Sequence, residues 1–434
     1  MGESYLLLTP WVWIVISLLL TFMILRRKNK AMKVEGMHRN RQSLGETINA
    51  LQDSTIAIRA SKTGAATLKN LWRLNNPFVS DSVELQQFYR RALVKTFSRT
   101  NSDTWAAIAH SVSRSLSPLL QRRYGADGSY SITANIKDVS RHVTLVAVLK
   151  GLFDIDNVPI ETLTYIGSEI HRLTVGKKQY DAGAAKPEYL PQDLQRSADR
   201  LIDILRDIFI EAKESNELAR TILCSVSGTP DNFNPLNLLI PAFEAPWRGV
   251  YYTLLAVLQK GSHEPKDVLI LRNCPAHQQP PAAALAIAYE SLRLYPPIRR
   301  VRRDQQVDIE AIQRDARYWG PTALKFDSSR FLDETGEVDV SLIGPGSAWM
   351  PFAVGSMKCP SAGGHSARMM TMLTGEILRQ IFPGNGMPQW YVDGPEWDSS
   401  ARKGQTLRAG RDEYAGVYVV ASVPGLDSTK ETSL

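Results

Sequence analysis

The sequence predicts a mainly α-helical domain with small β-sheets. Apolar residues recur at helical spacing in several long segments, whereas strand-like stretches are short and fall late in the chain. The chain has 434 residues, of which 44% are hydrophobic and 22% charged, enough to enclose a large core. We therefore expect one α-rich domain with small late sheets, behind a separate amino-terminal segment.

The amino-terminal segment has the pattern of a membrane anchor. Residues 5–25 are almost uninterruptedly apolar, which is about the length that crosses a bilayer as a helix. Arg26, Arg27 and Lys28 follow directly, and the positive-inside rule places such cations, and the rest of the chain, in the cytosol. A cleaved signal peptide is less favoured, because the start is not basic. We interpret residues 1–25 as a single-pass transmembrane anchor, 26–81 as a linker and shortened amino-terminal region, and 82–434 as the main domain.

The later elements follow from periodicity and from proline and glycine boundaries. Pro296 and Pro297 end an amphipathic helix, and residues between them and Pro351 suggest short strands and loops. The expected helices span residues 44–58, 82–120, 160–173, 194–219, 236–259, 282–295 and 363–381, and a strand is expected at 416–423.

Charge and cysteine content narrow the class of partner. The net charge of +7 suits an anionic membrane surface or an acidic protein. Beyond the amino-terminal segment, the basic run at residues 299–303 is too short to predict nucleic-acid binding, so no nucleic-acid partner is expected. Cys224, Cys274 and Cys359 form no C-x-x-C pair, which argues against zinc and favours reduced, cytosolic thiols.

One cysteine stands in a segment suited to metal ligation. Phe352, Gly355 and Lys358 lead into Cys359, and Pro360 then opens a helix-like run. A thiolate at a helix start is stabilised, because helix amino termini favour negative charge. Two other interpretations stay open: a buried structural thiol, which is the commoner fate of a lone cysteine, and a nucleophile with His365 as its base.

Glu290 and Arg293 form an E-x-x-R motif on the helix that ends before Pro296. Spacing of three places the carboxylate and the guanidinium on one helix face, where they can pair. The same motif begins at Glu169, Glu217 and Glu376, for which an ordinary surface pair is the default.

Three segments together resemble the cytochrome P450 superfamily, in particular its membrane-anchored fungal members. They are YESLRLYPP, VDIEAIQRDARYWGPTALKFDSSRF and MPFAVGSMKCP, and the resemblance is strongest over residues 236–381. It implies a P450-like fold in which Cys359 is the axial ligand of haem iron and Phe352 packs near it, with Gly355 in the turn of the haem-binding segment. It also implies that Glu290, Arg293 and Arg330 form a buried structural network.

The resemblance also shows where this chain departs from the family. Glu244 matches the acid of the oxygen-binding helix, a proton relay, but Ala245 stands in place of the threonine and Pro246 should kink the helix. The alternative is a core helix with one solvent-reaching glutamate. Met357 and Ser361 replace a basic residue and a glycine beside the cysteine, and W-x-x-x-R is missing because Ala109 follows Trp105. Candidate replacements for the haem propionate contacts are Lys358, His110, Arg300 and Arg302, the two arginines alternating on one face of a strand.

The functional hypothesis follows from this resemblance. It implies a haem-thiolate monooxygenase of fungal secondary-metabolite biosynthesis that oxidises a lipophilic small molecule with O2 and with electrons from NADPH-cytochrome P450 reductase. The anchor implies a single-pass protein of the endoplasmic reticulum membrane with a cytosolic catalytic domain. Two alternatives stay open: a haem-thiolate isomerase or dehydratase, suggested by Ala245, and a degenerate anchored homologue that binds no haem and acts as an interaction protein.

Overall fold

The computed structural model describes most of the chain between residues 69 and 423. The described residues are 44, 45, 48, 69–74, 76, 79, 83–125, 130–183, 192–215, 233–261, 263–302, 306–355, 358–384, 386–387, 389–397, 401, 405–410 and 412–423. The predicted anchor (1–25), most of the predicted linker (26–81) and nearly all of the expected helix at 44–58 lie outside them. No helix within these ranges is both long and apolar enough to span a membrane.

The first half of the domain is helical, with one short hairpin. The expected helix at 82–120 is two helices, because Asn101 interrupts it and its side-chain oxygen accepts a hydrogen bond from the Thr104 N–H at 2.9 Å. A long helix that we did not predict, α5, is buried along most of its length. The elements are α3 (Val83–Arg99), α4 (Ser102–Leu116), η2 (Ser117–Leu119), β1 (Gln121–Tyr124), β2 (Tyr130–Asn135), α5 (Ile136–Phe153), α6 (Ile160–Gly183) and α7 (Gln192–Ser215).

The second half carries the long central helix and the cysteine segment. The prediction of only short strands and loops between Pro297 and Pro351 is wrong, since four short helical turns lie there beside two short strands. The elements are α9 (Leu236–Leu258), α10 (Lys266–Arg272), α11 (Ala282–Leu294), β3 (Arg300–Arg302), β4 (Gln306–Asp308), α12 (Ile309–Gln313), α13 (Ala316–Trp319), η4 (Ser328–Phe331), α14 (Val340–Ile343), η6 (Pro360–Ala362), α15 (His365–Ile381), β5 (Gln389–Asp393) and β6 (Tyr418–Val423).

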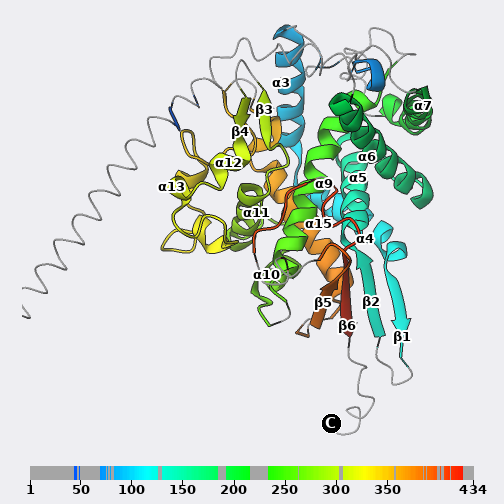
Figure 1. The fold of residues 1–434 in the computed structure, drawn as a ribbon. Helices are drawn as coiled ribbons and strands as arrows, with labels where there is room; N and C mark the ends of the chain where they lie inside the picture. Colours follow the sequence, from blue (N-terminus) through cyan, green and yellow to red (C-terminus); the bar gives the residue numbers. More distant parts are fainter. Residues whose placement is uncertain are drawn as a thin grey trace, which may run out of the picture.

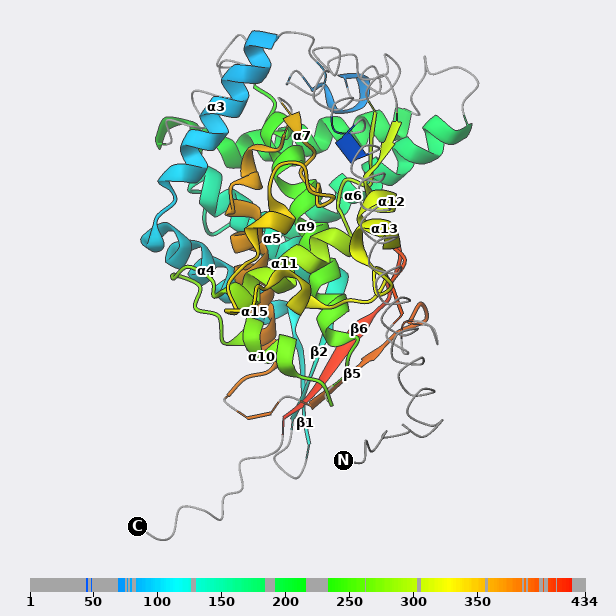
Figure 2. The same cartoon turned by 90° about the vertical axis from the view of Figure 1, so that its left-hand side faces the viewer.

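The main sheet joins distant parts of the chain. Its antiparallel order is β1-β2-β6-β5, with Ile132 opposite Ala421, and it lies at one end of the molecule in both views (Figures 1 and 2). The expectation of small late sheets is therefore met only in part, because β1 and β2 of this sheet come from the first half of the chain. The pairing brings the carboxy-terminal segment back onto the helical core.

The core is built around α9, which packs against α5, α11 and α15. Gly249 lets α9 and α15 approach closely, since a Cβ there would lie 2.9 Å from the Met370 Sδ. α11 is buried from Ala286 to Leu294, so our prediction of an amphipathic helix is wrong there. The core thus packs α9 against α15, the helix that follows the cysteine segment.

α9 runs unbroken through Pro241 and Pro246. A proline has no N–H, so Pro241 leaves the Asn237 carbonyl without its usual helical donor. The Asn76 amide and the Tyr89 hydroxyl donate to that carbonyl instead, at 3.0 and 3.3 Å. Side chains from the amino-terminal part of the domain thereby replace a missing helix hydrogen bond.

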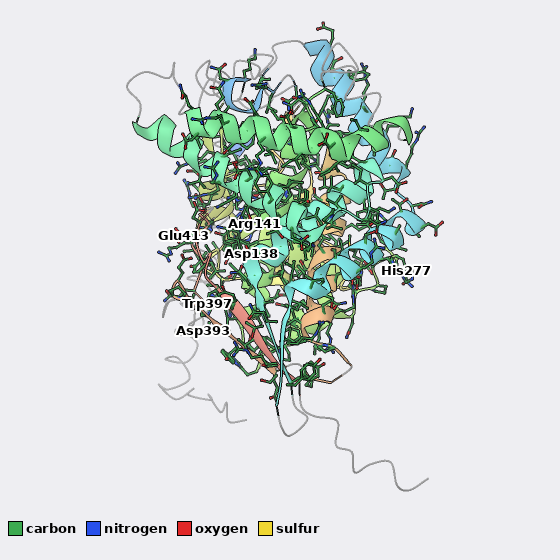
Figure 3. All side chains as sticks on the ribbon, turned by 90° about the vertical axis from the view of Figure 1, so that its right-hand side faces the viewer. Asp138, Arg141, His277, Asp393, Trp397 and Glu413 are labelled. Carbon is green, nitrogen blue, oxygen red and sulfur yellow. The ribbon has the colours of Figure 1, made fainter. Side chains whose placement is uncertain are left out.

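Two neighbouring tyrosines of α9 hold the carboxy-terminal loop. The hydroxyl of Tyr251 lies 2.8 Å from the carbonyls of both Glu413 and Tyr414, and that of Tyr252 lies 2.8 Å from the Arg408 carbonyl. Glu413 is visible at the edge of the molecule in Figure 3. These hydroxyls tie Arg408, Glu413 and Tyr414 to the central helix.

We expect the double substitution Tyr251→Phe and Tyr252→Phe to loosen this loop. Each change leaves backbone carbonyls without this donor, which costs about 1–3 kcal/mol of stability per buried group. Hydrogen exchange of the amides of residues 412–417 should accelerate at least about tenfold, while amides in the middle of α15 should be unchanged. Equal acceleration in both regions would contradict a local role.

Candidate functional site

A tight turn fixes the backbone before Cys359. The Cys359 N–H donates to the Phe352 carbonyl at 2.9 Å, and the Lys358 N–H donates to the Gly355 carbonyl at 3.1 Å. Gly355 has φ of 79°, a conformation that glycine adopts without a Cβ penalty. Ala353 has φ of 56°, which is uncommon for a residue with a side chain. The turn therefore defines the backbone position of the cysteine.

The thiol of Cys359 is exposed. Its Sγ lies 3.1 Å from the Ser361 Oγ, which in turn accepts a hydrogen bond from the Ser366 hydroxyl at 2.6 Å. The structure therefore contradicts the interpretation of Cys359 as a buried structural thiol. Cys274 has that character instead, since it is 2% exposed and burial raises its pKa.

A nucleophile–base pair of Cys359 and His365 gains no support. Within the described part of the chain no hydrogen bond joins the two, and the His365 ring stacks on Phe97 with 4.1 Å between centroids. Burial lowers the pKa of His365 to about 4, with Arg368 as a smaller cause. The imidazole is engaged in the packing between α3, α4 and α15.

The thiol stands before a short turn rather than before the long helix. Cys359 precedes the three-residue η6, and α15 begins only at His365, after Gly364 with φ of 98°. Helix-terminus electrostatics fall off within about one turn. The long helix therefore gives the thiolate less support than the sequence suggested, and the Ser361 hydroxyl is the described group that contacts it.

Glu290 and Arg293 form a fully buried, two-bonded ion pair. Both side chains are 0% exposed, and the two carboxylate–guanidinium hydrogen bonds measure 2.6 and 2.8 Å. Arg330 joins them, with its Nε 3.7 Å from the Glu290 Oε1. Burial raises the pKa of Glu290, and the hydrogen bonds from Arg293 oppose that shift. The structure thus brings together the three residues predicted as a network.

Gln313 connects this network to the cysteine segment, a link that the sequence did not reveal. Arg293 donates to the Gln313 carbonyl at 2.7 Å, and the Gln313 side-chain oxygen accepts from the Met350 N–H at 2.8 Å. The Trp349 indole N–H donates to the Tyr289 carbonyl at 3.1 Å. The chain leading to Phe352 is therefore hydrogen-bonded to α11 and its surroundings.

The other E-x-x-R pairs are less exposed than we expected. Glu169 and Glu376 pair with arginines three residues later, yet the two glutamates are only 8% and 7% exposed. Their arginines reach solvent, with side chains 48% and 31% exposed, which distinguishes them from Arg293. The default of an ordinary surface pair is wrong for these two glutamates, and Glu217 lies outside the described residues.

The predicted propionate contacts are not assembled into one group. His110 is exposed on α4, Lys358 is half-buried, and Arg300 is exposed and pairs with Asp308 at 3.3 Å. The predicted β3 is present, but the side chain of Arg302 lies outside the described residues. Among described residues, no hydrogen bond or ion pair joins these candidates to Cys359, and their role stays a prediction.

Arg368 is a further basic residue near this segment. Its guanidinium lies over the Trp105 ring, 4.8 Å from the centroid, and Trp105 also lies 5.0 Å from the His365 ring. Spacing could not reveal this neighbour of Trp105, because the two residues are far apart in sequence. Arg368 thus joins the basic residues that could serve a bound acidic group here.

Glu244 is half-buried on α9, and its Oε1 is shielded from solvent. The interpretation as a solvent-reaching glutamate of a core helix stays open, because the residue as a whole is half-buried. Ala245 adds no hydroxyl beside it, since a methyl group neither donates nor accepts a hydrogen bond. The relay role of Glu244 stays a prediction.

A charged cluster that joins α5 and α6 to Asp412 of the carboxy-terminal loop also escaped sequence reasoning. The Lys137 Nζ lies 3.4 Å from both His171 and Asp412, and His171 lies 2.7 Å from Asp412. Lys137 is 3% exposed, and burial, then the Arg141 charge, lowers its pKa. Figure 3 shows Arg141 beside Asp138 on α5, with which it pairs at 2.7 Å.

Comparison with known proteins relates the cysteine-bearing region to one protein family. Residues 305–380 match the sequence model of the family Cytochrome P450. Cytochrome P450 734A2 of Oryza sativa subsp. japonica is 36% identical over 127 residues, covering 25% of this chain and 22% of the relative. Cytochrome P450 714D1 of the same organism is 33% identical over 90 residues, covering 17% and 15%. The matches support the cytochrome P450 superfamily, and they span less than a quarter of these relatives' length.

The cofactor implied by this match is haem with its iron bound by a cysteine thiolate. The matched interval contains Phe352, Cys359 and Arg330. A thiolate is one of the axial ligands of haem iron, and Cys359 offers an exposed thiol on a fixed backbone. Within the described residues, no group of three or more His, Cys, Asp or Glu could hold a metal ion by itself. The donor set fits a single thiolate ligand.

Proposed function

We propose that this protein is a haem-thiolate monooxygenase that oxidises a lipophilic small molecule with electrons from NADPH-cytochrome P450 reductase. The observation that carries the proposal is the exposed Cys359 thiol, held by a turn that follows Met350, whose N–H donates to Gln313, the residue that accepts from Arg293 of the buried pair. The proposal includes anchoring through residues 5–25 to the endoplasmic reticulum membrane and a place in fungal secondary metabolism, which rest on the sequence pattern and the resemblance.

The residues around Cys359 would have separate roles in holding the haem. Haem bound by a thiolate supplies cleavage of the O–O bond, because the sulfur donates electron density to iron. Cys359 would hold the iron, and the Ser361 hydroxyl would stabilise the thiolate by a charge-assisted hydrogen bond. Lys358 and Arg368 would offer positive charge to carboxylates, and Phe352 would fix the turn through its carbonyl.

Proton delivery would depend on Glu244. Its carboxyl group would exchange protons at Oε1 through water or a substrate hydroxyl, because Ala245 provides no neighbouring hydroxyl. The absent hydroxyl is also the observation that favours a second candidate, a haem-thiolate isomerase or dehydratase, which needs neither O2 nor a reductase.

The test is incorporation of oxygen from ¹⁸O2. The full chain in membranes is incubated with reductase, NADPH and a panel of lipophilic small molecules. We expect a product that carries one ¹⁸O atom and forms only with the reductase. Conversion without reductase and without ¹⁸O would establish the isomerase or dehydratase instead.

We expect Glu244→Gln to lower the rate of product formation about a hundredfold, since positioned proton transfer contributes roughly 10²–10⁴-fold. Haem content should not change, because Glu244 belongs to α9 and not to the cysteine segment. Glu334→Gln, at an exposed loop residue, is the matched control. A rate unaffected by Glu244→Gln would remove this residue from the proton path.

A further inference from the structure

A cavity of about 240 Å³ lies between α4, α5 and the segment that joins α5 to α6. Its lining is mainly apolar and includes Val146, Leu149, Val158 and Leu163. Cys359 is not among the lining residues, so this space is separate from the candidate haem-thiolate site. A cavity of roughly 150 Å³ can hold benzene, so this pocket, which is partly open to solvent, has room for a single ring with a substituent.

His142 from α5 is a buried polar group that faces this cavity. It is 4% exposed and lines the cavity, and apart from a contact with the Ser115 backbone neither ring nitrogen has a hydrogen-bond partner in the part of the chain that the structure describes. Burial lowers the pKa of His142 to about 4, and the hydrogen bond with the Ser115 backbone opposes this shift. The imidazole is therefore neutral at pH 7, with one nitrogen donating and the other accepting.

The charged residues beside His142 already satisfy one another. Asp156 accepts hydrogen bonds from the Arg114 guanidinium at 2.6 Å, from the Asn157 N–H at 3.0 Å and from the Ser111 hydroxyl at 3.1 Å. Neither a cation nor an anion would find a free partner of opposite charge here. The arrangement favours an uncharged ligand.

We propose that this cavity binds a small, uncharged, mainly apolar molecule with one hydroxyl group, of the size and chemistry of a phenol, through a hydrogen bond to His142. A hydroxyl both donates and accepts, so it suits either tautomer of the neutral imidazole. The apolar walls contact the ring, and the hydroxyl supplies a partner to the imidazole nitrogen that faces the pocket. The site does not depend on the proposed function, since no residue of the cysteine segment lines it.

The test uses phenol and benzene as probes on the full chain. In protein labelled with ¹⁵N-histidine, phenol should shift the His142 ring signals saturably, and it should bind about tenfold more tightly than benzene by calorimetry, because one buried hydrogen bond distinguishes the two. His142→Phe should remove this preference. His277→Phe is the matched control, since His277 is exposed and lies far from Arg141, the neighbour of His142, in Figure 3.

Three results would overturn the proposal. Wild-type protein whose His142 signals do not respond to phenol would show that the cavity holds only water. Equal affinities for phenol and benzene would exclude the hydrogen bond. An unchanged preference in His142→Phe would place phenol elsewhere. The wild-type titration decides the question even where the variant does not fold.

Discussion

Replacing Arg293 with alanine will lower the free energy of unfolding by about 3–5 kcal/mol, the cost of leaving a buried charge without its partner. The Glu290 carboxylate is 0% exposed and receives two hydrogen bonds from Arg293. Arg293 also donates to the Gln313 and Ala323 carbonyls at 2.7 and 2.8 Å, which would lose their donor. Urea denaturation followed by far-ultraviolet circular dichroism measures the change.

The chain supplies its own control for this prediction. Arg172→Ala breaks a pair with the same E-x-x-R spacing, but the Arg172 side chain is 48% exposed and water can reach it. We expect a loss of about 1–2 kcal/mol there, more than for a fully exposed pair because Glu169 is largely buried, and less than for a pair that is buried on both sides. Equal effects of the two substitutions would show that burial does not set the strength of the Glu290–Arg293 pair.

Replacing Cys359 with alanine will remove bound haem, with haem per protein falling about tenfold or more. Changing groups that merely support a metal ligand already costs roughly 10–100-fold in metal affinity, and Cys359 is the proposed ligand itself. The fold should persist, since the thiol is exposed and makes one side-chain hydrogen bond, to Ser361. Haem content is measured on purified protein by the absorbance of extracted haem.

Cys274→Ala is the matched thiol control. Cys274 is buried away from solvent and contributes its backbone carbonyl to Arg379, a contact that the substitution keeps. Haem content should stay within about twofold of the wild type in this variant, because Cys274 is neither the proposed ligand nor a group that supports it. Loss of haem in Cys274→Ala but not in Cys359→Ala would show that the iron ligand is Cys274 and not Cys359.

Local patterns predicted the elements with strong periodicity. α9 and α15 lie within two residues of their expected bounds, and β6 was placed by its apolar run. The pairing of Glu290 with Arg293 followed from helix geometry alone, because residues three apart share a face. Such features depend only on neighbours along the chain, which the sequence contains in full.

Features that depend on tertiary packing could not be predicted. β1 and β2 are short, and β2 finds its partner in β6 nearly 300 residues later. α5 is buried on most of its surface, so it lacks the alternation of polar and apolar residues that marks an amphipathic helix. Gln313 and Arg368 owe their positions to long-range contacts, and His142 is notable only because a cavity opens beside it.

The most direct test of the central claim is the difference spectrum of reduced, carbon-monoxide-bound protein, recorded on the full chain in microsomes. Our account predicts a strongly red-shifted Soret band, the signature of a thiolate opposite carbon monoxide, from Cys359 as the iron ligand. A well-expressed protein with no haem band would contradict the account and leave an interaction protein. A haem band without the shift would mean that the iron is held by a group other than Cys359.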